Sequence, residues 1–226
     1  MDQARQQTRS RTQTKLTLPR LYPILDSALL GARQCSFEMA AAAMLDAGAA
    51  ILQIRHKGHW TRDLFEQAQL VMRLCQQAAA PLIVNDRADV ALLLNAGLHL
   101  GQDDLPPQDA RRLIGAATCL GYSTHNAAQL TAAAQEPVDY LAIGPLFATQ
   151  SKINPDPVVG VDRLRDWRAL TTKPLVAIGG ITRENARSVL EAGADSVAVI
   201  GDLLPADCTV ASIAERFHQW QRRITK

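Results

Sequence analysis

Three polar residues stand two apart where a short apolar run ends. Gln53, Arg55 and Lys57 alternate with Ile54 and His56, and side chains two apart in a strand share one face. Two cations on one face predict a binding site for a multiply charged anion. A solvated strand end, where lysine and arginine are ordinary, explains this motif alone equally well.

Acidic residues follow the next two apolar runs. Asn85 and Asp86 come after one of them, and Asp103 and Asp104 come after the other. Each pair can cap the helix that follows it. Because both runs deliver carboxylates beside the anion site, the pattern favours a magnesium ion that bridges them to phosphate oxygens.

A fifth run ends in Ser123-Thr124-His125. Ser123 can cap a helix, and a Ser–His nucleophile pair is disfavoured because the sequence has no Gly-x-Ser-x-Gly turn around it. After a sixth run, the segment 143–160 includes Thr149, Ser151 and Lys152, which are adaptable anion donors. Its length and prolines predict a stiffened lid.

Glycines follow the last two apolar runs. Gly179 and Gly180 come after residues 175–178, and Gly201 comes after residues 196–199. Bare backbone N–H groups at such turns can approach a phosphate closely. Tight turns also need glycine, and both interpretations can hold together, so we expect a second anion site here.

These motifs require a regular succession of short strands and helices. We expect strands at 21–25, 51–54, 81–84, 98–100, 119–122, 140–143, 175–178 and 196–199, and helices at 37–47, 62–79, 88–96, 107–114, 127–135, 161–170, 183–192 and 208–222. Such alternation predicts a parallel sheet. Eight units favour an α/β fold, a single (β/α)8 TIM barrel, over a doubly wound open sheet. Glycines at 48, 97 and 193 are expected to end helices in the left-handed conformation.

Composition and charge exclude several classes of protein. The 226 residues are 47% hydrophobic with a net charge of +2, which excludes a disordered chain and argues against a nucleic-acid binder. No apolar run reaches the roughly 18 residues of a membrane helix. Residues 1–17 carry four cations against Asp2 and predict a disordered basic arm before a barrel at 18–226, although a transit peptide is an alternative. The four separated cysteines indicate free buried thiols, and so a reducing, cytoplasmic location.

Taken together, the strand-end motifs resemble those of the family shared by thiamine phosphate synthases and thiazole tautomerases. The matching segments are Gln53-Ile-Arg-His-Lys57, Asn85-Asp-Arg87, His99-Leu-Gly-Gln-Asp-Asp104, Gly121-Tyr-Ser-Thr-His125, Ile143-Gly-Pro-Leu-Phe147, Thr149-Gln-Ser-Lys152, Gly179-Gly-Ile181 and Val199-Ile-Gly201. They cover nearly the whole chain after residue 17, in order.

The resemblance implies a magnesium-dependent synthase that joins a hydroxymethylpyrimidine diphosphate to a hydroxyethylthiazole phosphate and releases pyrophosphate. It assigns Arg55, Lys57, Ser123 and Lys152 to catalysis and Asp86 and Asp104 to the metal, with Asp104 chosen over Asp103 from the family's Gly-Gln-x-Asp spacing. The substrate-binding residues that it implies are Gln53, Ile54, Arg55, His56, Lys57, Asn85, Ser123, Thr149, Gln150, Ser151, Lys152, Gly180, Ile200 and Gly201. Gly201 stands where the family often has serine, and the His56 side chain is expected on the opposite strand face.

Three other functions compete with this one. A thiazole tautomerase would use His125 as acid and base, but it would need no diphosphate site. A barrel enzyme acting on a sugar phosphate would explain only the glycines at 179–180 and 201. A non-catalytic phosphate-ligand binding protein would not need the acidic pair. The sequence leaves open whether copies of the chain associate into a homo-oligomer.

Overall fold

The computed structural model describes residues 18–149 and 156–225, and within them eight parallel strands close into a barrel. The strands are β1 (Leu21–Asp26), β2 (Leu52–Arg55), β3 (Leu82–Asn85), β4 (Gly97–Leu100), β5 (Leu120–Thr124), β6 (Tyr140–Ile143), β7 (Leu175–Ile178) and β8 (Ser196–Val199). Each strand pairs with the next along the chain, and β8 pairs with β1. The predicted (β/α)8 barrel is therefore confirmed, while the arm expected at 1–17 lies outside the described residues.

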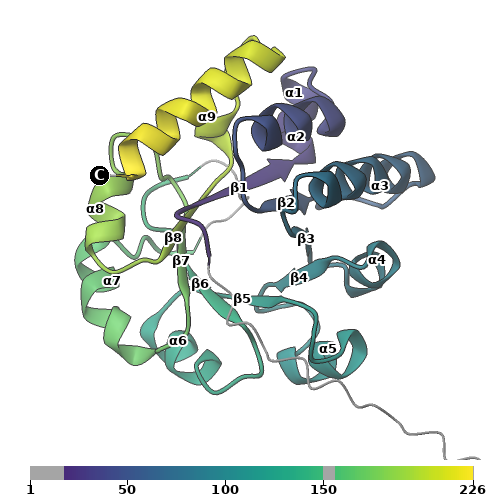
Figure 1. The fold of residues 1–226 in the computed structure, drawn as a ribbon. Coiled ribbons are helices and arrows are strands. Elements are labelled where there is room, and N and C mark those ends of the chain that lie inside the picture. Colours follow the sequence, from purple (N-terminus) through teal and green to yellow (C-terminus); the bar gives the residue numbers. More distant parts are fainter. Residues whose placement is uncertain (1–17, 150–155, 226) are drawn as a thin grey trace, which may run out of the picture.

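Helices surround the strands on the outside (Figure 1). They are α1 (Ser27–Ala32), α2 (Phe37–Asp46), α3 (Arg62–Gln77), α4 (Ala88–Leu94), α5 (Pro107–Ile114), α6 (Ala127–Ala133), α7 (Val161–Trp167), α8 (Ala186–Glu191) and α9 (Val210–Ile224), with short 3-10 turns η1 (Arg168–Leu170) and η2 (Gly201–Leu203). The last helix, α9, packs against α2 and α8, so it completes the ring of helices around the barrel. No helix in the described ranges is long and apolar enough to span a membrane.

Apolar side chains fill two separate layers. The inner one lies inside the barrel and consists of Leu18, Tyr22, Ile24, Ile51, Ile83, Tyr140, Ala142, Val176 and Ala198. A larger outer layer lies between the strands and the helices, and alternate residues such as Leu25 and Ile54 belong to it. This alternation is the strand period of two. It therefore also tells which polar residues point into the barrel.

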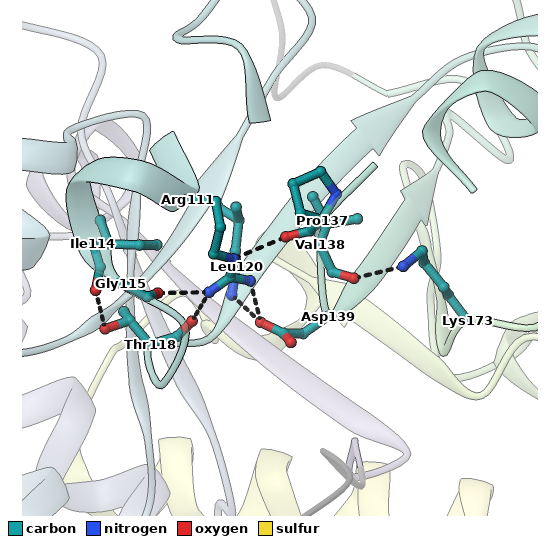
Figure 2. Close-up of polar contacts among 9 residues, drawn as sticks. All are labelled: Arg111, Ile114, Gly115, Thr118, Leu120, Pro137, Val138, Asp139 and Lys173. Atoms are coloured by element: carbon teal, nitrogen blue, oxygen red, sulfur yellow. Dashed lines mark hydrogen bonds and ion pairs between the residues drawn. The ribbon is translucent and has the colours of Figure 1, made fainter. Parts of the chain in front are cut away.

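Carboxylates tie neighbouring strands together at the base of the barrel. Asp139, just before β6, accepts hydrogen bonds from the Leu120 backbone N–H of β5 at 2.7 Å and from Arg111 Nη2 at 2.8 Å. Figure 2 shows the Arg111 guanidinium also reaching the carbonyl oxygens of Gly115, Thr118 and Pro137.

The same device recurs two strands further on. Asp195, just before β8, accepts from the Leu175 N–H of β7 at 2.8 Å and from Arg168 at 3.3 Å. Asp139 and Asp195 thus each accept a hydrogen bond from a backbone N–H at the start of a strand, which has no partner within the sheet.

Some local expectations were wrong. A short helix, α1, follows β1 directly because Asp26 Oδ1 accepts from the Leu29 N–H at 3.1 Å and so caps it. The left-handed residue after α4 is Asn95, with φ +54°, and not Gly97. Gly97 instead begins β4, and a Cβ there would collide with Ile83. Gly48 and Gly193 do adopt positive φ values, of +93° and +108°, as expected.

Candidate functional site

Each of the two predicted cations at the end of β2 has a carboxylate partner. Arg55 Nη1 forms an ion pair with Asp26 Oδ2, its cross-strand neighbour on β1. Lys57 Nζ lies 2.6 Å from Asp86 Oδ2, in the turn after β3. The Lys57 side chain is 56% exposed and that of Arg55 is 17% exposed. The rim therefore presents both cations to the barrel mouth, but each is already neutralised.

Asp86 and Asp104 come together at this rim. Burial and the neighbouring Asp104 raise the pKa of Asp86, while Lys57 lowers it. Asp104 accepts a hydrogen bond from the Gly101 N–H at 2.7 Å, whereas Asp103 is exposed. Neither Asp86 nor Asn85 caps α4, whose N-cap position is Arg87 and has no side-chain cap bond.

This pair of carboxylates fits the magnesium ion that the sequence predicted. Magnesium is commonly held by one or two carboxylates together with substrate phosphates, and it keeps several waters. The described residues contain no cluster of three or more His, Cys, Asp or Glu that would form a complete protein cage. Asp86 and Asp104 are the two carboxylates that would hold such an ion, since Asp104 is the acid after β4 that interacts with Asp86.

A chain of buried hydrogen bonds runs across the inside of the barrel. Gln53 Nε2 donates to Tyr22 Oη at 3.0 Å, and Tyr22 Oη lies 2.9 Å from Tyr140 Oη. Tyr140 Oη lies 2.9 Å from His99 Nδ1, and His99 Nε2 lies 2.9 Å from Ser123 Oγ. The chain thus links Gln53 to Ser123, two of the predicted substrate-binding residues.

Burial lowers the pKa of His99 to about 4, so the imidazole is neutral and carries one N–H. Either hydroxyl can donate in the Tyr22–Tyr140 bond, and the tautomer of His99 decides which ring nitrogen donates. With the imidazole hydrogen on Nε2, it is donated to Ser123 Oγ, and the Ser123 hydroxyl hydrogen is then left for a ligand at the barrel mouth.

Gly121 and Asn85 lie next to this chain of hydrogen bonds. Gly121 has no side chain because a Cβ there would collide with both Tyr140 and His99. Asn85, the last residue of β3, is the cross-strand neighbour of His99 on β4. It is buried, and its Nδ2 has no hydrogen-bond partner in the described part of the chain. A buried donor without a partner is costly, so Asn85 is suited to receive a ligand oxygen. Ser123 itself lies within β5, and the helix cap expected of it is supplied by Asn126.

The loop after β6 returns on itself. Val159 N–H donates to Pro145 O at 2.8 Å and Gly160 N–H donates to Leu146 O at 3.1 Å, so the two ends of the predicted lid lie together. Thr149 is at the edge of the described part, and Gln150, Ser151 and Lys152 lie outside it. His125 Nδ1 lies 2.7 Å from Gly144 O and 3.5 Å from Asp156 Oδ2. Its contacts therefore hold the base of this loop.

Glycine backbone lines the opposite side of the mouth. Gly179 and Gly180 have φ values of +97° and +63°, and a Cβ on Gly180 would collide with the Phe147–Ala148 backbone. Asn185 Nδ2 donates to Gly180 O at 3.1 Å and Asn185 Oδ1 accepts from the Thr182 N–H at 2.8 Å. Because of this turn, Thr182–Asn185, α8 begins at Ala186 and not at residue 183 as expected.

Space is open above the end of β8. A Cβ on Gly201 would meet no atom within 4 Å, so a ligand can approach the backbone at Ile200 and Gly201 closely. The residues of the two predicted anion sites therefore lie on different arcs of one rim. The first set follows β2 to β6, and the second follows β7 and β8.

Two predicted substrate-binding residues have their side chains elsewhere. Ile54 is buried in the outer core between strands and helices. His56 Nδ1 lies 2.7 Å from Ser27 Oγ, and its ring meets Trp60 edge to face. The residues that the sequence reasoning missed are Asp26, Tyr22, His99 and Tyr140. Their inward strand positions were the available signal, because Tyr22 and Tyr140 belong to the layer inside the barrel and Asp26 and His99 stand at inward positions of their strands.

Comparisons with known proteins agree on one family. The family model described as thiamine monophosphate synthase matches residues 21–203. A thiamine-phosphate synthase of Koribacter versatilis is 52% identical over 192 residues, which are 84% of this chain and 90% of that protein. A thiamine-phosphate synthase of Chloroflexus aurantiacus is 43% identical over 194 residues, with coverage of 85% and 88%.

A solved structure is similar as well. The thiamine phosphate pyrophosphorylase of Pyrococcus furiosus superimposes with a TM-score of 0.75 at 31% identity, and the match covers 90% of this chain and 95% of that one.

Proposed function

The chain belongs to the thiamine monophosphate synthase family and is a transferase of thiamine biosynthesis, and from this premise we propose its substrates and the roles of its residues. It joins a hydroxymethylpyrimidine diphosphate to a hydroxyethylthiazole phosphate, giving thiamine phosphate and pyrophosphate. The observation that carries this assignment is the meeting of Lys57, Asp86 and Asp104 at one arc of the rim. Cations and paired carboxylates together suit a diphosphate bound with magnesium.

The diphosphate lies against the arc from β2 to β5. Arg55 and Lys57 contact its oxygens, with Lys152 from the loop after β6. Asn85 Nδ2, which has no partner among the described residues, donates to it. Magnesium, held by Asp86 and Asp104, would supply positive charge to the same oxygens. Gln53 and Ser123 hold the pyrimidine ring, because the buried chain between them fixes how each presents its polar atoms.

The thiazole phosphate lies across the mouth. Its phosphate is received by the backbone of Gly180, Ile200 and Gly201 and by Thr149, Gln150 and Ser151 of the loop, where bare amides and hydroxyls suit an anion. Its ring nitrogen then faces the pyrimidine methylene carbon. The two substrates are thus aligned before any bond changes, which is a large part of catalysis in a two-substrate reaction.

The reaction proceeds by departure of pyrophosphate first. The bond between the methylene carbon and the diphosphate oxygen breaks, and the electron pair leaves with pyrophosphate. Arg55, Lys57 and Lys152 stabilise the charge that develops there. The pyrimidine cation is attacked by the thiazole nitrogen lone pair, which forms the new carbon–nitrogen bond. No side chain needs to act as a nucleophile, and the barrel mouth keeps water from the cation.

We also propose a cytoplasmic location, which the four free cysteines support, since disulfides form mainly in oxidising compartments.

The test is coupled product formation from the two purified substrates. We expect thiamine phosphate and pyrophosphate to appear in equal amounts and only when magnesium and both substrates are present. Omission of the thiazole phosphate alone provides the control for hydrolysis of the diphosphate. Folded protein that makes no thiamine phosphate under these conditions would contradict the proposal.

A further inference from the structure

One carboxylate at the rim is held between two arginines from different elements. Asp202 Oδ2 accepts from Arg183 Nε at 2.9 Å, and Asp202 Oδ1 lies 3.5 Å from Arg183 Nη2. Arg216 Nη1 donates to the Asp202 backbone oxygen at 2.9 Å and lies 3.8 Å from Oδ1. The three side chains are only 19–24% exposed.

These contacts join the two turns that carry the glycines of the second anion site. Asp202 directly follows Gly201 after β8, and Arg183 lies in the turn that follows Gly180 after β7. Arg216 comes from α9, so the carboxylate connects both turns to a long helix. Charge-assisted hydrogen bonds of this kind are about twice as strong as neutral ones, and a partly buried pair is weakly screened.

Both guanidinium groups are occupied within the protein. Arg183 also donates from Nη1 to Gln219 Oε1 on α9, while Arg216 donates to backbone. Neither arginine is thereby arranged as a direct phosphate ligand. Their contacts instead fix where the chain lies at Gly201, whose open side faces solvent.

We propose that Asp202 is a positioning residue for the thiazole phosphate, which it holds indirectly by fixing the Ile200–Gly201 backbone against the Gly179–Gly180 turn. This inference rests on the proposed function, because it assumes that this backbone receives that phosphate. Asp202 does not touch the substrate. Its carboxylate sets the spacing between two turns whose amides must converge on one ligand.

The test compares the two Michaelis constants of Asp202→Ala and Asp202→Asn. For Asp202→Ala we expect the KM for the thiazole phosphate to rise about tenfold or more, while the KM for the pyrimidine diphosphate changes by less than about twofold. Asp202→Asn keeps the shape and one acceptor but loses the charge, so its effect should be smaller and in the same direction. Thermal unfolding confirms that each variant is folded.

A matched control exists at the other end of the barrel. Arg168→Gln breaks the Arg168–Asp195 pair at the base, so it should lower thermal stability but leave both KM values unchanged. An equal rise in both KM values for Asp202→Ala, or no rise in either, would overturn the inference. A lower KM for the thiazole phosphate would also overturn it, because it would mean that a released arginine binds the phosphate directly.

A binding measurement separates this inference from the proposed reaction. Calorimetric titration of the thiazole phosphate in the presence of magnesium and pyrophosphate requires no turnover. We expect the Kd to rise about tenfold in Asp202→Ala, which corresponds to 1.4 kcal/mol. Wild-type protein that binds but makes no product would contradict only the proposed reaction, and wild-type protein that does not bind would overturn the inference.

Discussion

Lys57 Nζ and Asp86 Oδ2 lie 2.6 Å apart, so a proposed ligand of the diphosphate is paired with a proposed ligand of the metal. The two residues come from the ends of adjacent strands, β2 and β3. Their pairing connects the cations proposed to bind the diphosphate with the carboxylates proposed to bind the metal. Burial and Asp104 raise the pKa of Asp86, whereas Lys57 counteracts them. The ion pair therefore helps to keep the carboxylate charged before a ligand arrives.

Replacement of Asp86 tests the metal site. We expect Asp86→Ala to lower kcat/KM at least about a hundredfold, or ~3 kcal/mol of transition-state stabilisation, because one of two carboxylates is lost. The barrel should remain folded, since Asp86 lies at the rim. The measurement is initial velocity over a range of magnesium concentrations, with circular dichroism to check folding.

Asp89→Asn is the control for this change. Asp89 is an exposed acid in the first turn of α4 that pairs with Arg87, so its loss should leave turnover unchanged. Unaltered turnover in Asp86→Ala would remove Asp86 from the metal site.

The buried imidazole of His99 makes stability depend on pH. Burial lowers the pKa of His99 to about 4 from its usual 6.5, so the unfolded chain binds a proton between these values while the folded chain does not. The free energy of unfolding should therefore fall as the pH decreases through this window, by about 2 kcal/mol at pH 5 from this residue. Urea unfolding of the wild type and His99→Gln at pH 7.5 and pH 5 measures the effect.

The His99→Gln variant should lose less stability than the wild type between these two pH values, although it is less stable at pH 7.5. An identical loss in both proteins would show that His99 does not titrate as its burial indicates.

The base of the barrel predicts a strong contrast between two adjacent arginines. Arg111→Gln should lower the free energy of unfolding by at least ~2 kcal/mol, because three carbonyls and Asp139 lose their donor (Figure 2). Arg112→Gln removes only an exposed pair with Asp109 and should cost less than ~0.5 kcal/mol. Denaturant unfolding measures both, and equal costs would contradict the structural role of Arg111.

The cysteines should be inert in the folded protein. Burial raises the pKa of Cys35, Cys75 and Cys119 to about 12, and Cys208 is buried. A thiol must lose its proton to react. We therefore expect no reaction with a colorimetric disulfide reagent at pH 8 and four reactive thiols in urea. Rapid reaction of the native protein would contradict this.

Much of the architecture could be predicted because strand and helix signals are local. Apolar runs of four or five residues, followed by helical patterns, placed all eight strands within two residues of their observed ends. The helix α1 was missed because its signal is one capping residue, Asp26, inside what reads as a strand end. Gly97 was misassigned because the need for glycine there arises from Ile83 on a neighbouring strand.

The candidate site was only partly visible in the sequence. The polar residues at strand ends were found because several successive strands end in them, and the ends of parallel strands meet at one rim. Their partners were not, because an ion pair such as Arg55–Asp26 depends on the register between β1 and β2. His99 and Tyr140 were overlooked individually, since each is an ordinary residue until closure of the barrel brings them within 2.9 Å of each other.

We expect the ion pairs of Arg55 and Lys57 to make the rim selective among anions before any substrate is bound. A ligand that takes Arg55 or Lys57 must compete with Asp26 or Asp86, so binding is an exchange of counter-ions and not a simple addition. We expect a monovalent anion to compete poorly, because its single charge can replace only one of the two carboxylates that pair with Arg55 and Lys57. A polyanion that arrives with its own cation can satisfy both sides at once. The site should therefore bind metal-bound polyanions in preference to anions with a single charge.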